Sequence, residues 1–207
     1  METSEDLDKK TIQNLATLLR KNGDKILSGE SKFCLTTGSI VTLNASFHRC
    51  SSLNLESEEQ PKEQAWRDDV HLLFDFVRKT VALKVIHGTY TIRAPIQISR
   101  FKNLRSLEVK KVPIHMLEGL QILRGQLVTL TISKSLQTLK DLFEVCGGDR
   151  SSGMSWECLK FAFLSFNNII KVDESLKTTF LNSPEILELS WYSLKIPVQN
   201  YKSQSEV

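Results

Sequence analysis

The sequence has 207 residues, of which 41% are hydrophobic and 25% are charged, so it can bury a core and does not have the composition of a disordered chain. The formal net charge of +3 is unevenly divided, because residues 1–70 hold 9 basic and 12 acidic groups whereas residues 71–207 hold 18 and 12. No apolar run reaches 18 residues and the first six residues are polar and acidic, which argues against a membrane span or a signal peptide and indicates a cytoplasmic protein.

The first predicted element is a helix near the N-terminus. Its apolar stripe at helical spacing consists of Leu7, Ile12, Leu15, Leu18 and Leu19. Thr3 and Ser4 are suitable caps for its start, and Gly23 is a suitable stop. A second helix is predicted from about residue 39 to 47, although its β-branched residues are weaker helix formers.

The next segment, residues 51–66, is polar, acidic and interrupted by Pro61, which predicts a mobile loop. Asp68 and Asp69 then precede a strongly apolar stretch from Val70 to Val77, and we expect them to cap a third helix there. Residues 1–79 are therefore predicted to form a helical N-terminal cap.

From residue 80 onward, five segments place apolar residues in the spacing Leu-x-x-Leu-x-Leu. The clearest, residues 159–169, fits the leucine-rich-repeat template L-x-x-L-x-L-x-x-N-x-L, with Ala162 at the fourth position and Asn167 at the ninth. The other segments are residues 80–85, 104–109, 127–132 and 184–189. Their sixth positions are separated by steps of 24, 23, 32 and 25 residues, and three of these steps are typical of leucine-rich repeats. The pattern predicts an α/β solenoid with parallel strands over residues 80–194.

The template also predicts which side chains point inward. Because side chains alternate along a strand, the fourth and sixth residues of each repeat should be buried. These core positions are Leu83, Val85, Leu107, Val109, Leu130, Ile132, Ala162, Leu164, Leu187 and Leu189. The outward positions on the concave side are the candidate partner-binding residues, namely Lys84, Glu108, Lys110, Thr131, Phe161, Phe163, Ile186 and Glu188. Phe161, Phe163 and Ile186 would form an apolar cluster there, either exposed for a partner or covered by a loop or the tail.

The ninth position of the template normally carries an asparagine that bonds loop backbone in the next coil. Only Asn167 satisfies it, while Val112, Ser135 and Tyr192 stand in the equivalent places, so the early coils are expected to be irregular. The segments after the strands have apolar spacing compatible with short helices, and residues 146–153 indicate a loop insertion that explains the long step. Residues 195–207 form a polar tail in which residues 195–198 can fold back over the last strand.

No catalytic, cofactor or metal site is predicted. The four histidines are scattered, and His115 with Glu118, three apart on an expected helix, makes an incomplete metal site. Gly147-Gly148-Asp149 lacks the Lys-Ser/Thr of a phosphate-binding loop and is typical of a turn.

Three further features have plain structural explanations. The four cysteines lack C-x-x-C spacing and indicate reduced thiols, and the glycosylation sequon at residues 44–46 lacks a secretory signal. A basic strip, consisting of Arg100, Lys102, Arg105, Lys110 and Lys111, could contact nucleic acid. It has no interleaved aromatics and no nucleic-acid module accompanies it, so a solvated face explains it better and no nucleic-acid partner is predicted.

Several motifs in order resemble one known family. They include residues 18–24, 26–29, 74–80, 101–108, 113–115, 133–139 and 146–149. Together they resemble the N-terminal region of the serine/threonine kinase 11-interacting protein family, from about residue 7 to residue 190. Nischarin, a related leucine-rich-repeat scaffold, shares only the elements at residues 101–104 and 173–176. The resemblance implies a cytoplasmic adaptor without enzymatic activity that binds a serine/threonine kinase, influences where the kinase resides, and associates peripherally with endolysosomal membranes.

The sequence departs from that family after residue 190. Trp191-Tyr192-Ser193-Leu194 replaces the expected repeat continuation, which an alternative transcript or a truncated gene model would explain. We therefore expect a protein-interaction scaffold. The alternative is a structural cap-plus-repeat fragment without a partner of its own.

Overall fold

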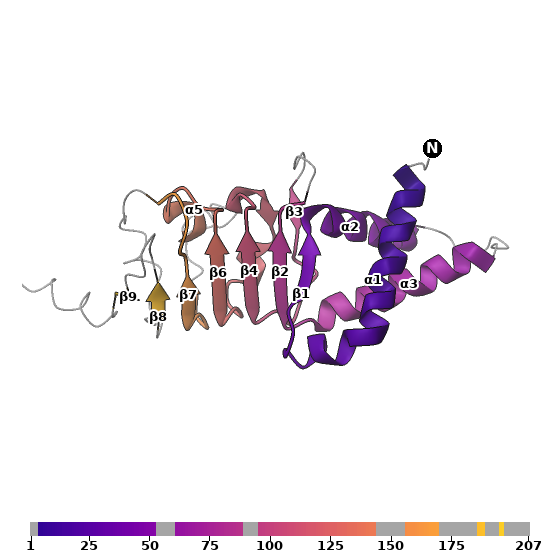
Figure 1. Cartoon of the computed structure of the whole chain (residues 1–207), viewed down its shortest axis with the longest axis horizontal. Coiled ribbons are helices and arrows are strands. Elements are labelled where there is room, and N and C mark those ends of the chain that lie inside the picture. Colours follow the sequence, from indigo (N-terminus) through magenta and orange to yellow (C-terminus); the bar gives the residue numbers. More distant parts are fainter. Residues whose placement is uncertain are drawn as a thin grey trace, which may run out of the picture.

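The computed structural model describes residues 4–52, 61–88, 95–143, 156–169, 186–188 and 195–196. It is a mixed α/β structure with a helical N-terminal layer and a seven-stranded sheet (Figure 1). The strands follow the order β1-β2-β4-β6-β7-β8-β9, and every neighbouring pair up to β8 is parallel. Helices α1, α2 and α3 lie beyond β1, at one end of the row of strands.

The helical layer begins with α1, Ser4–Leu27. The helix is longer than predicted, and its stripe was partly wrong, because Leu7 and Leu18 are 47% and 42% exposed. The buried face instead uses Ile12, Ala16, Leu19 and Ile26. Gly23 does not stop the helix: it lies inside α1, where a Cβ atom would come within 2.6 Å of the Phe76 ring. The glycine therefore permits a close crossing between α1 and α3.

Strand β1, Phe33–Thr36, was not predicted at all. It follows α1 and pairs in parallel with β2, Ala82–Ile86, so that Phe33 lies opposite Leu83 and Leu35 opposite Val85. Phe33 and Leu35 are buried. The sheet thus begins within the N-terminal region, for which helices and a loop were predicted but no strand.

The segment predicted as a loop is largely helical where it is described. Helix α2, Thr37–Ser52, confirms the second predicted helix and extends it, and α3 spans Pro61–Lys79. Asp68 and Asp69 therefore lie inside α3 and do not cap it. Proline is compatible with the first position of a helix because the backbone N–H it lacks would have no partner there. Residues 53–60 lie outside the described part of the chain.

The predicted strand register is confirmed for the repeats. Strands β4, Ser106–Lys110, β6, Thr129–Ser133, and β7, Phe161–Phe163, align the fourth position of each repeat, so that Leu83, Leu107, Leu130 and Ala162 form one row. The eight predicted core residues from Leu83 to Leu164 are all at most 1% exposed. Strand β8, Ile186–Glu188, continues the row through Leu187, and Leu189 lies outside the described residues.

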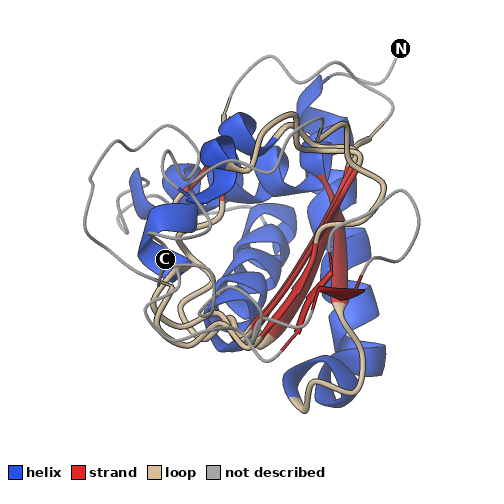
Figure 2. Cartoon of the chain, turned by 90° about the vertical axis from the view of Figure 1, so that its left-hand side faces the viewer, coloured by secondary structure: helices blue, strands red, loops and turns tan. Residues whose placement is uncertain are grey.

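A second layer faces the inner side of the sheet. It contains the two-stranded parallel sheet of β3, Ile96–Gln97, and β5, Leu117–Glu118, the 3-10 helix η1, Ile114–Met116, and the short helices α4, Leu120–Leu123, and α5, Lys140–Phe143. Figure 2, which looks along the row of strands, shows most helical segments on one side of the sheet. Short return helices were predicted, whereas β3 and β5 were not. The return segment at residues 172–180 and the insertion at 146–153 lie outside the described residues.

Asn167 behaves largely as its template position predicts. Its side chain is buried, accepts hydrogen bonds from the backbone N–H groups of Ser135 and Leu136, and donates to the carbonyls of Ile132 and Leu164, over distances of 2.7–3.1 Å. Its partners lie in the preceding coil and its own coil, not in the next coil as predicted. Ser135 also bonds backbone groups at the ninth position one coil earlier. Its hydroxyl accepts a hydrogen bond from the Val112 N–H and donates one to the Ser133 carbonyl.

Strand β9, Lys195–Ile196, is antiparallel to β8, with Ile196 opposite Leu187 and Lys195 opposite Glu188. The expectation that the start of the tail folds back over the last strand is confirmed for these two residues. Their pairing supplies hydrogen-bond partners along an edge that would otherwise be open. Tyr192 and the rest of the tail lie outside the described residues.

Candidate interaction surface

The outward side chains of the sheet form rows that run across the strands. Lys84, Glu108, Thr131 and Phe163 lie opposite one another on successive strands, and Glu188 of β8 continues this backbone row. The neighbours of the first four residues along their strands are fully buried, which fixes these four on the opposite face. The structure therefore brings five of the eight candidate residues into a single row.

The other three candidates lie in the two adjacent rows. Phe161 is opposite Thr129 on one side and Ile186 on the other, while Lys110 is opposite Ser133 at the far end of β4. Phe161 and Phe163 are both half-buried and lie on the two sides of buried Ala162. The pairing brings the Phe161 and Ile186 backbones together, and the side chains of Ile186 and Glu188 lie outside the description. Whether these residues contact a partner stays a prediction.

The end of this surface near β1 is charged. The Glu108 carboxylate accepts hydrogen bonds from both the Lys32 and the Lys84 ammonium groups, each at 2.6 Å. Burial raises the pKa of Glu108, but the two lysines together outweigh burial and hold the pKa below its ordinary value. The hydrogen bond to Glu108 raises the pKa of Lys84 in return. This triad, Lys32–Glu108–Lys84, therefore places two basic side chains around one acidic side chain.

Sequence reasoning missed the contribution of β1 to this surface. Lys32 precedes β1, and Cys34 within it lies opposite Lys84, exposed and with a free thiol. The signal was present, because Phe33 and Leu35 alternate with Cys34 and Thr36 after Gly29. A strand of only four residues gives a short pattern, and it does not carry the leucine template of the later strands.

The helical layer offers a second, different surface. Four charged side chains from its three helices form a closed ring, in which Lys9 contacts Glu5 and Glu63 at 3.4 and 3.2 Å and Arg49 contacts the same two carboxylates at 2.8 and 3.1 Å. Arg49 also lies 4.9 Å from the centre of the Trp66 ring. Hydrogen bonds from Arg49 and Lys9 lower the pKa of Glu5, and the bond to Glu63 raises that of Lys9.

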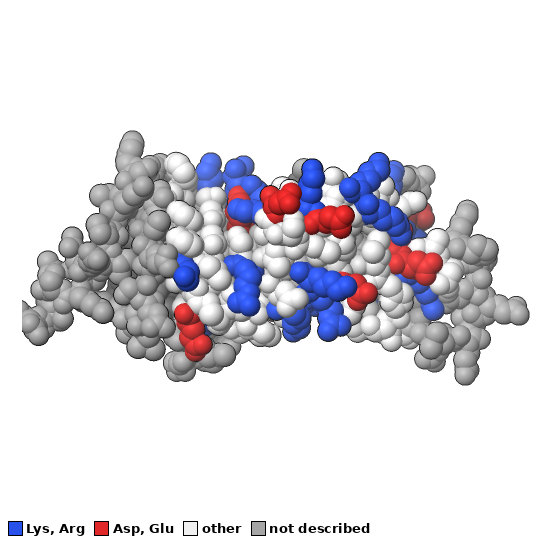
Figure 3. All heavy atoms as spheres, turned by 90° about the horizontal axis from the view of Figure 1, so that it is seen from below, with Lys and Arg blue, Asp and Glu red and all other residues white. Residues whose placement is uncertain are grey.

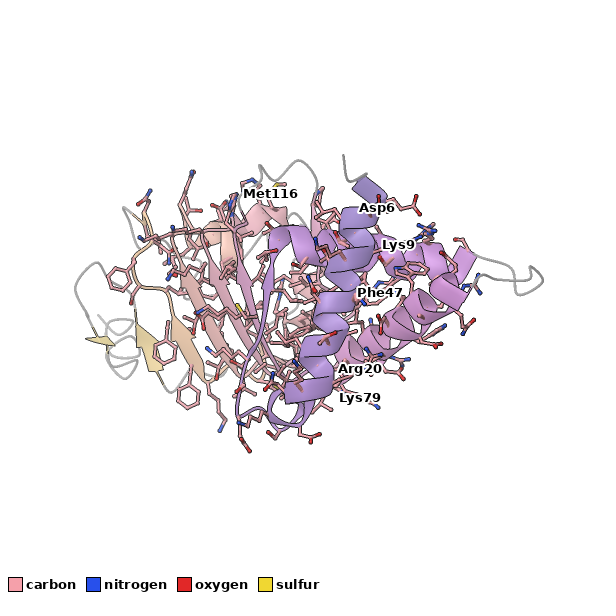
Figure 4. All side chains as sticks on the ribbon, turned by 45° about the vertical axis from the view of Figure 1, so that its right-hand side comes forward. Asp6, Lys9, Arg20, Phe47, Lys79 and Met116 are labelled. Atoms are coloured by element: carbon pink, nitrogen blue, oxygen red, sulfur yellow. The ribbon has the colours of Figure 1, made fainter. Side chains whose placement is uncertain are left out.

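A separate ion pair joins α1 and α3 further along α1. Arg20 contacts Asp69 of α3 at 2.6 Å. Figure 4 shows Lys9 and Arg20 at two different heights on α1, so that α1 is connected to α3 at two levels. Leu7 and Leu18 of α1 are exposed. The layer thus has partly exposed ion pairs between its helices and scattered apolar side chains on its surface.

The predicted basic strip is not one strip in the structure. Arg100 lies over the rings of Phe47 and Phe74, at 5.6 and 5.9 Å, where it connects the helical layer to the loops between the strands. Lys102 lies before β4 and Lys110 is the last residue of β4, so the two lysines are at opposite ends of the strand. The face drawn in Figure 3 also has basic and acidic side chains interspersed. These positions agree with the solvated-face explanation and do not form a continuous track for a phosphate backbone.

Other kinds of site find no support within the described residues. No three histidine, cysteine or carboxylate side chains there gather in a way that could hold a metal ion. His115 belongs to η1 and Glu118 to β5, so the helix expected to carry both does not exist. Cys34, Cys50 and Cys158 are free thiols. Among the helices described, none is long and apolar enough to cross a membrane.

Comparison with known proteins adds a family relationship. Residues 7–89 match the family model described as LKB1 serine/threonine kinase interacting protein 1. The chain is 37% identical over 189 residues to the serine/threonine-protein kinase 11-interacting protein of Homo sapiens, and 35% identical over 190 residues to that of Gallus gallus. Each alignment covers 86% of this chain and 17% of the relative. The resemblance predicted from the motifs is confirmed, and the chain spans about one sixth of the length of these relatives.

Proposed function

Since the chain is related in sequence to the serine/threonine kinase 11-interacting proteins, we propose that it is a partner-binding module without enzymatic activity and that its partner is a serine/threonine kinase. The relatives are named for an interaction with such a kinase. An interaction module needs a stable surface and no catalytic pocket.

We further propose that the sheet is a leucine-rich-repeat solenoid, with repeats over residues 80–194 and a cap over residues 1–79 that contributes β1. Three observations support this assignment. The fourth and sixth positions of four repeats are buried, and Asn167 bonds backbone in two coils. In addition, the eighth position of three successive repeats has a left-handed backbone, at Lys111, Lys134 and Phe166.

The outward face of the sheet is the surface that we propose for the partner. The observation that carries this choice is the pair of half-buried aromatic rings, Phe161 and Phe163, which project from β7 away from the core. Aromatic side chains are frequent anchors at protein interfaces, where they bury a large area at a small cost in conformational entropy. The charged triad around Glu108 lies in the same row as Phe163 and would orient a partner seated on the rings.

The helical layer is the second candidate surface. The family model matches residues 7–89, which correspond to α1, β1, α2, α3 and β2 and not to the later strands. If the interaction is carried by the part that this family shares, exposed residues of α1 such as Leu18 would contact the kinase. A third outcome, a structural fragment without its own partner, requires that neither surface binds.

Capture of the purified kinase on the immobilised chain separates these alternatives. We expect Phe163→Glu to abolish capture and to leave the thermal midpoint nearly unchanged, because the ring is already partly in contact with water. Ile122→Glu is the control, since it places the same charge at an exposed apolar side chain of α4, away from the outward face of the sheet. Retained capture by Phe163→Glu would exclude the sheet face. Absence of capture by the unmodified chain would support the structural fragment.

A further inference from the structure

Three successive coils turn through the same unusual backbone conformation. Lys111, Lys134 and Phe166 have φ angles of 59°, 55° and 60°, and each occupies the eighth position of its repeat. The turns are bonded to one another, because the N–H of Lys111 donates to the Ser133 carbonyl and that of Lys134 to the Phe166 carbonyl. The coil geometry therefore fixes this conformation, whatever side chain is present.

The folding of the chain does not explain why one of these residues is phenylalanine. A left-handed backbone is tolerated best by glycine and asparagine and poorly by bulky side chains. Phe166 is also 61% exposed, the largest fraction among the large hydrophobic side chains that the structure describes. Within the described residues, the ring thus neither fills the core nor eases the turn, which leaves it available for a contact with another molecule.

Beside Phe166 the surface is hollow. A pocket of about 520 Å³ lies where the chain leaves β4, β6 and β7, and its buried walls are Ile114 and Leu136. Two of its backbone groups are already engaged: the Ile114 N–H donates to the Ser135 carbonyl, and the Asn168 N–H donates to the Leu136 carbonyl. The lining is mixed, because Pro113, Ile114, Leu136 and Phe166 are apolar and the other six residues are polar, and the volume admits one large side chain of a ligand.

The charge at the pocket comes from two exposed lysines and one carboxylate. Lys134 lines it, and Lys111, which occupies the equivalent position in the preceding coil, is exposed in the neighbouring turn. Asp141 is the one carboxylate among the lining residues, and it is half-buried at the start of α5. Two exposed ammonium groups against one half-buried carboxylate favour an acidic ligand.

We propose that this pocket is a docking site for an acidic peptide segment of a partner protein. The segment inserts one large apolar side chain between Phe166 and the walls formed by Ile114 and Leu136. Its carboxylates pair with Lys111 and Lys134. The site lies at the ends of the strands and is distinct from the outward sheet face. Its test is therefore independent of the test of the proposed kinase surface.

The test uses a fluorescein-labelled peptide, Glu-Glu-Ser-Trp-Glu-Glu, titrated with the full chain and followed by fluorescence anisotropy. We expect saturable binding that weakens with salt and weakens about tenfold or more in Phe166→Asn, because a truncated aromatic anchor commonly costs at least that factor. The same variant should keep or raise the thermal midpoint, since asparagine suits the left-handed turn. If Phe166 had only a structural role, Phe166→Asn would instead lower the thermal midpoint.

Two further comparisons distinguish the apolar contact from the charge contact. Lys111→Glu with Lys134→Glu should weaken binding and flatten its salt dependence, whereas Phe163→Glu on the sheet face should leave it unchanged. Peptides with alanine for tryptophan or lysine for glutamate should both bind more weakly. Equal binding of Phe166→Asn, equal binding of the lysine peptide, or no saturable binding by the unmodified chain would overturn the proposal.

Discussion

The helical layer and the parallel sheet are held together in different ways. In the sheet, equivalent positions recur from strand to strand: the fourth and sixth residues are buried in four segments, the eighth is left-handed in three, and the ninth bonds backbone through a polar side chain in two. In the helical layer each contact occurs once, such as the ring of Glu5, Lys9, Arg49 and Glu63 or the close passage of Gly23 by Phe76. Stability is therefore distributed along the sheet and concentrated at single points in the layer.

The two regions are nevertheless joined at several places. Strand β1 belongs to the helical region by sequence but to the sheet by its hydrogen bonds. Arg100, from the loop before β4, lies over Phe47 of α2 and Phe74 of α3. The side-chain amide of Asn44 in α2 donates to the Gln97 carbonyl in β3 at 2.8 Å. We therefore expect the layer and the sheet to unfold as one cooperative unit.

The largest expected effect tests that cooperativity. Leu107 in β4 and Leu73 in α3 are both fully buried, so Leu107→Ala and Leu73→Ala should each lower the free energy of unfolding by about 2–5 kcal/mol. If the regions unfold together, circular dichroism and tryptophan fluorescence will give one coincident thermal transition for both variants. Two separated transitions, each shifted by only one of the substitutions, would show that the helical layer and the sheet are independent domains.

The next prediction concerns the repeated solution within the sheet. Asn167→Ala leaves two donors and two acceptors of the backbone without their partner, so we expect a loss of roughly 2–4 kcal/mol. Ser135→Ala is the matched change one coil earlier, and it removes two hydrogen bonds at a less buried site. Its cost should be about 1 kcal/mol. Chemical denaturation measures both, and equal costs would show that the ninth position does not depend on the asparagine.

A smaller effect is expected in the charged ring of the helical layer. Arg49→Met removes two ion pairs but keeps an apolar stem beside Trp66. Exposed pairs contribute little, so the loss should be about 1 kcal/mol or less and should shrink further in high salt. Thermal melts at low and high ionic strength will test this. A loss as large as that of Asn167→Ala would show that the layer depends on its ion pairs as much as the sheet depends on its buried amide.

The pH dependence links the two regions. Glu5 in the layer and Glu108 in the sheet both have pKa values held below the ordinary value by nearby cations. A lowered pKa in the folded state gives stability that is present above the unfolded-state pKa and is lost as the pH falls through the folded-state value. The thermal midpoint should therefore decline below about pH 5, and Glu5→Gln with Glu108→Gln should make that decline shallower. If the thermal midpoint of the double variant falls with decreasing pH as steeply as that of the unmodified chain, this assignment is contradicted.

How much the sequence predicts also differs between the regions. In the sheet, the leucine template located β2, β4, β6, β7 and β8 and their described buried residues correctly because each of these segments repeats the same pattern, but it missed β1. It did not predict the left-handed eighth residues, since Lys111 and Phe166 are not residue types that indicate such a turn. The role of Asn167 was predicted except for its direction, because a single sequence does not reveal which neighbouring coil the amide meets.

In the helical layer, local signals were misleading. Gly23 suggested a helix end, but its position is explained by the approach of Phe76 from α3, a contact between residues far apart in the sequence. Leu7 and Leu18 suggested a buried stripe, yet α3 and α2 cover a different face of α1. Pro61 and the acidic residues around it indicated a loop, so the start of α3 was predicted at Asp68 and Asp69 and not at Pro61, where the helix begins. Tertiary packing determined each of these features.

The most direct test of the proposed function compares the two regions in one binding experiment. Purified serine/threonine kinase would be titrated against the unmodified chain, Phe163→Glu on the sheet face and Leu18→Glu on the outside of α1, with thermal melts to establish that all three are folded. We predict that Phe163→Glu weakens binding about tenfold or more while Leu18→Glu binds like the unmodified chain. The opposite result, with Leu18→Glu impaired and Phe163→Glu unaffected, would contradict the assignment and make the helical layer the partner surface.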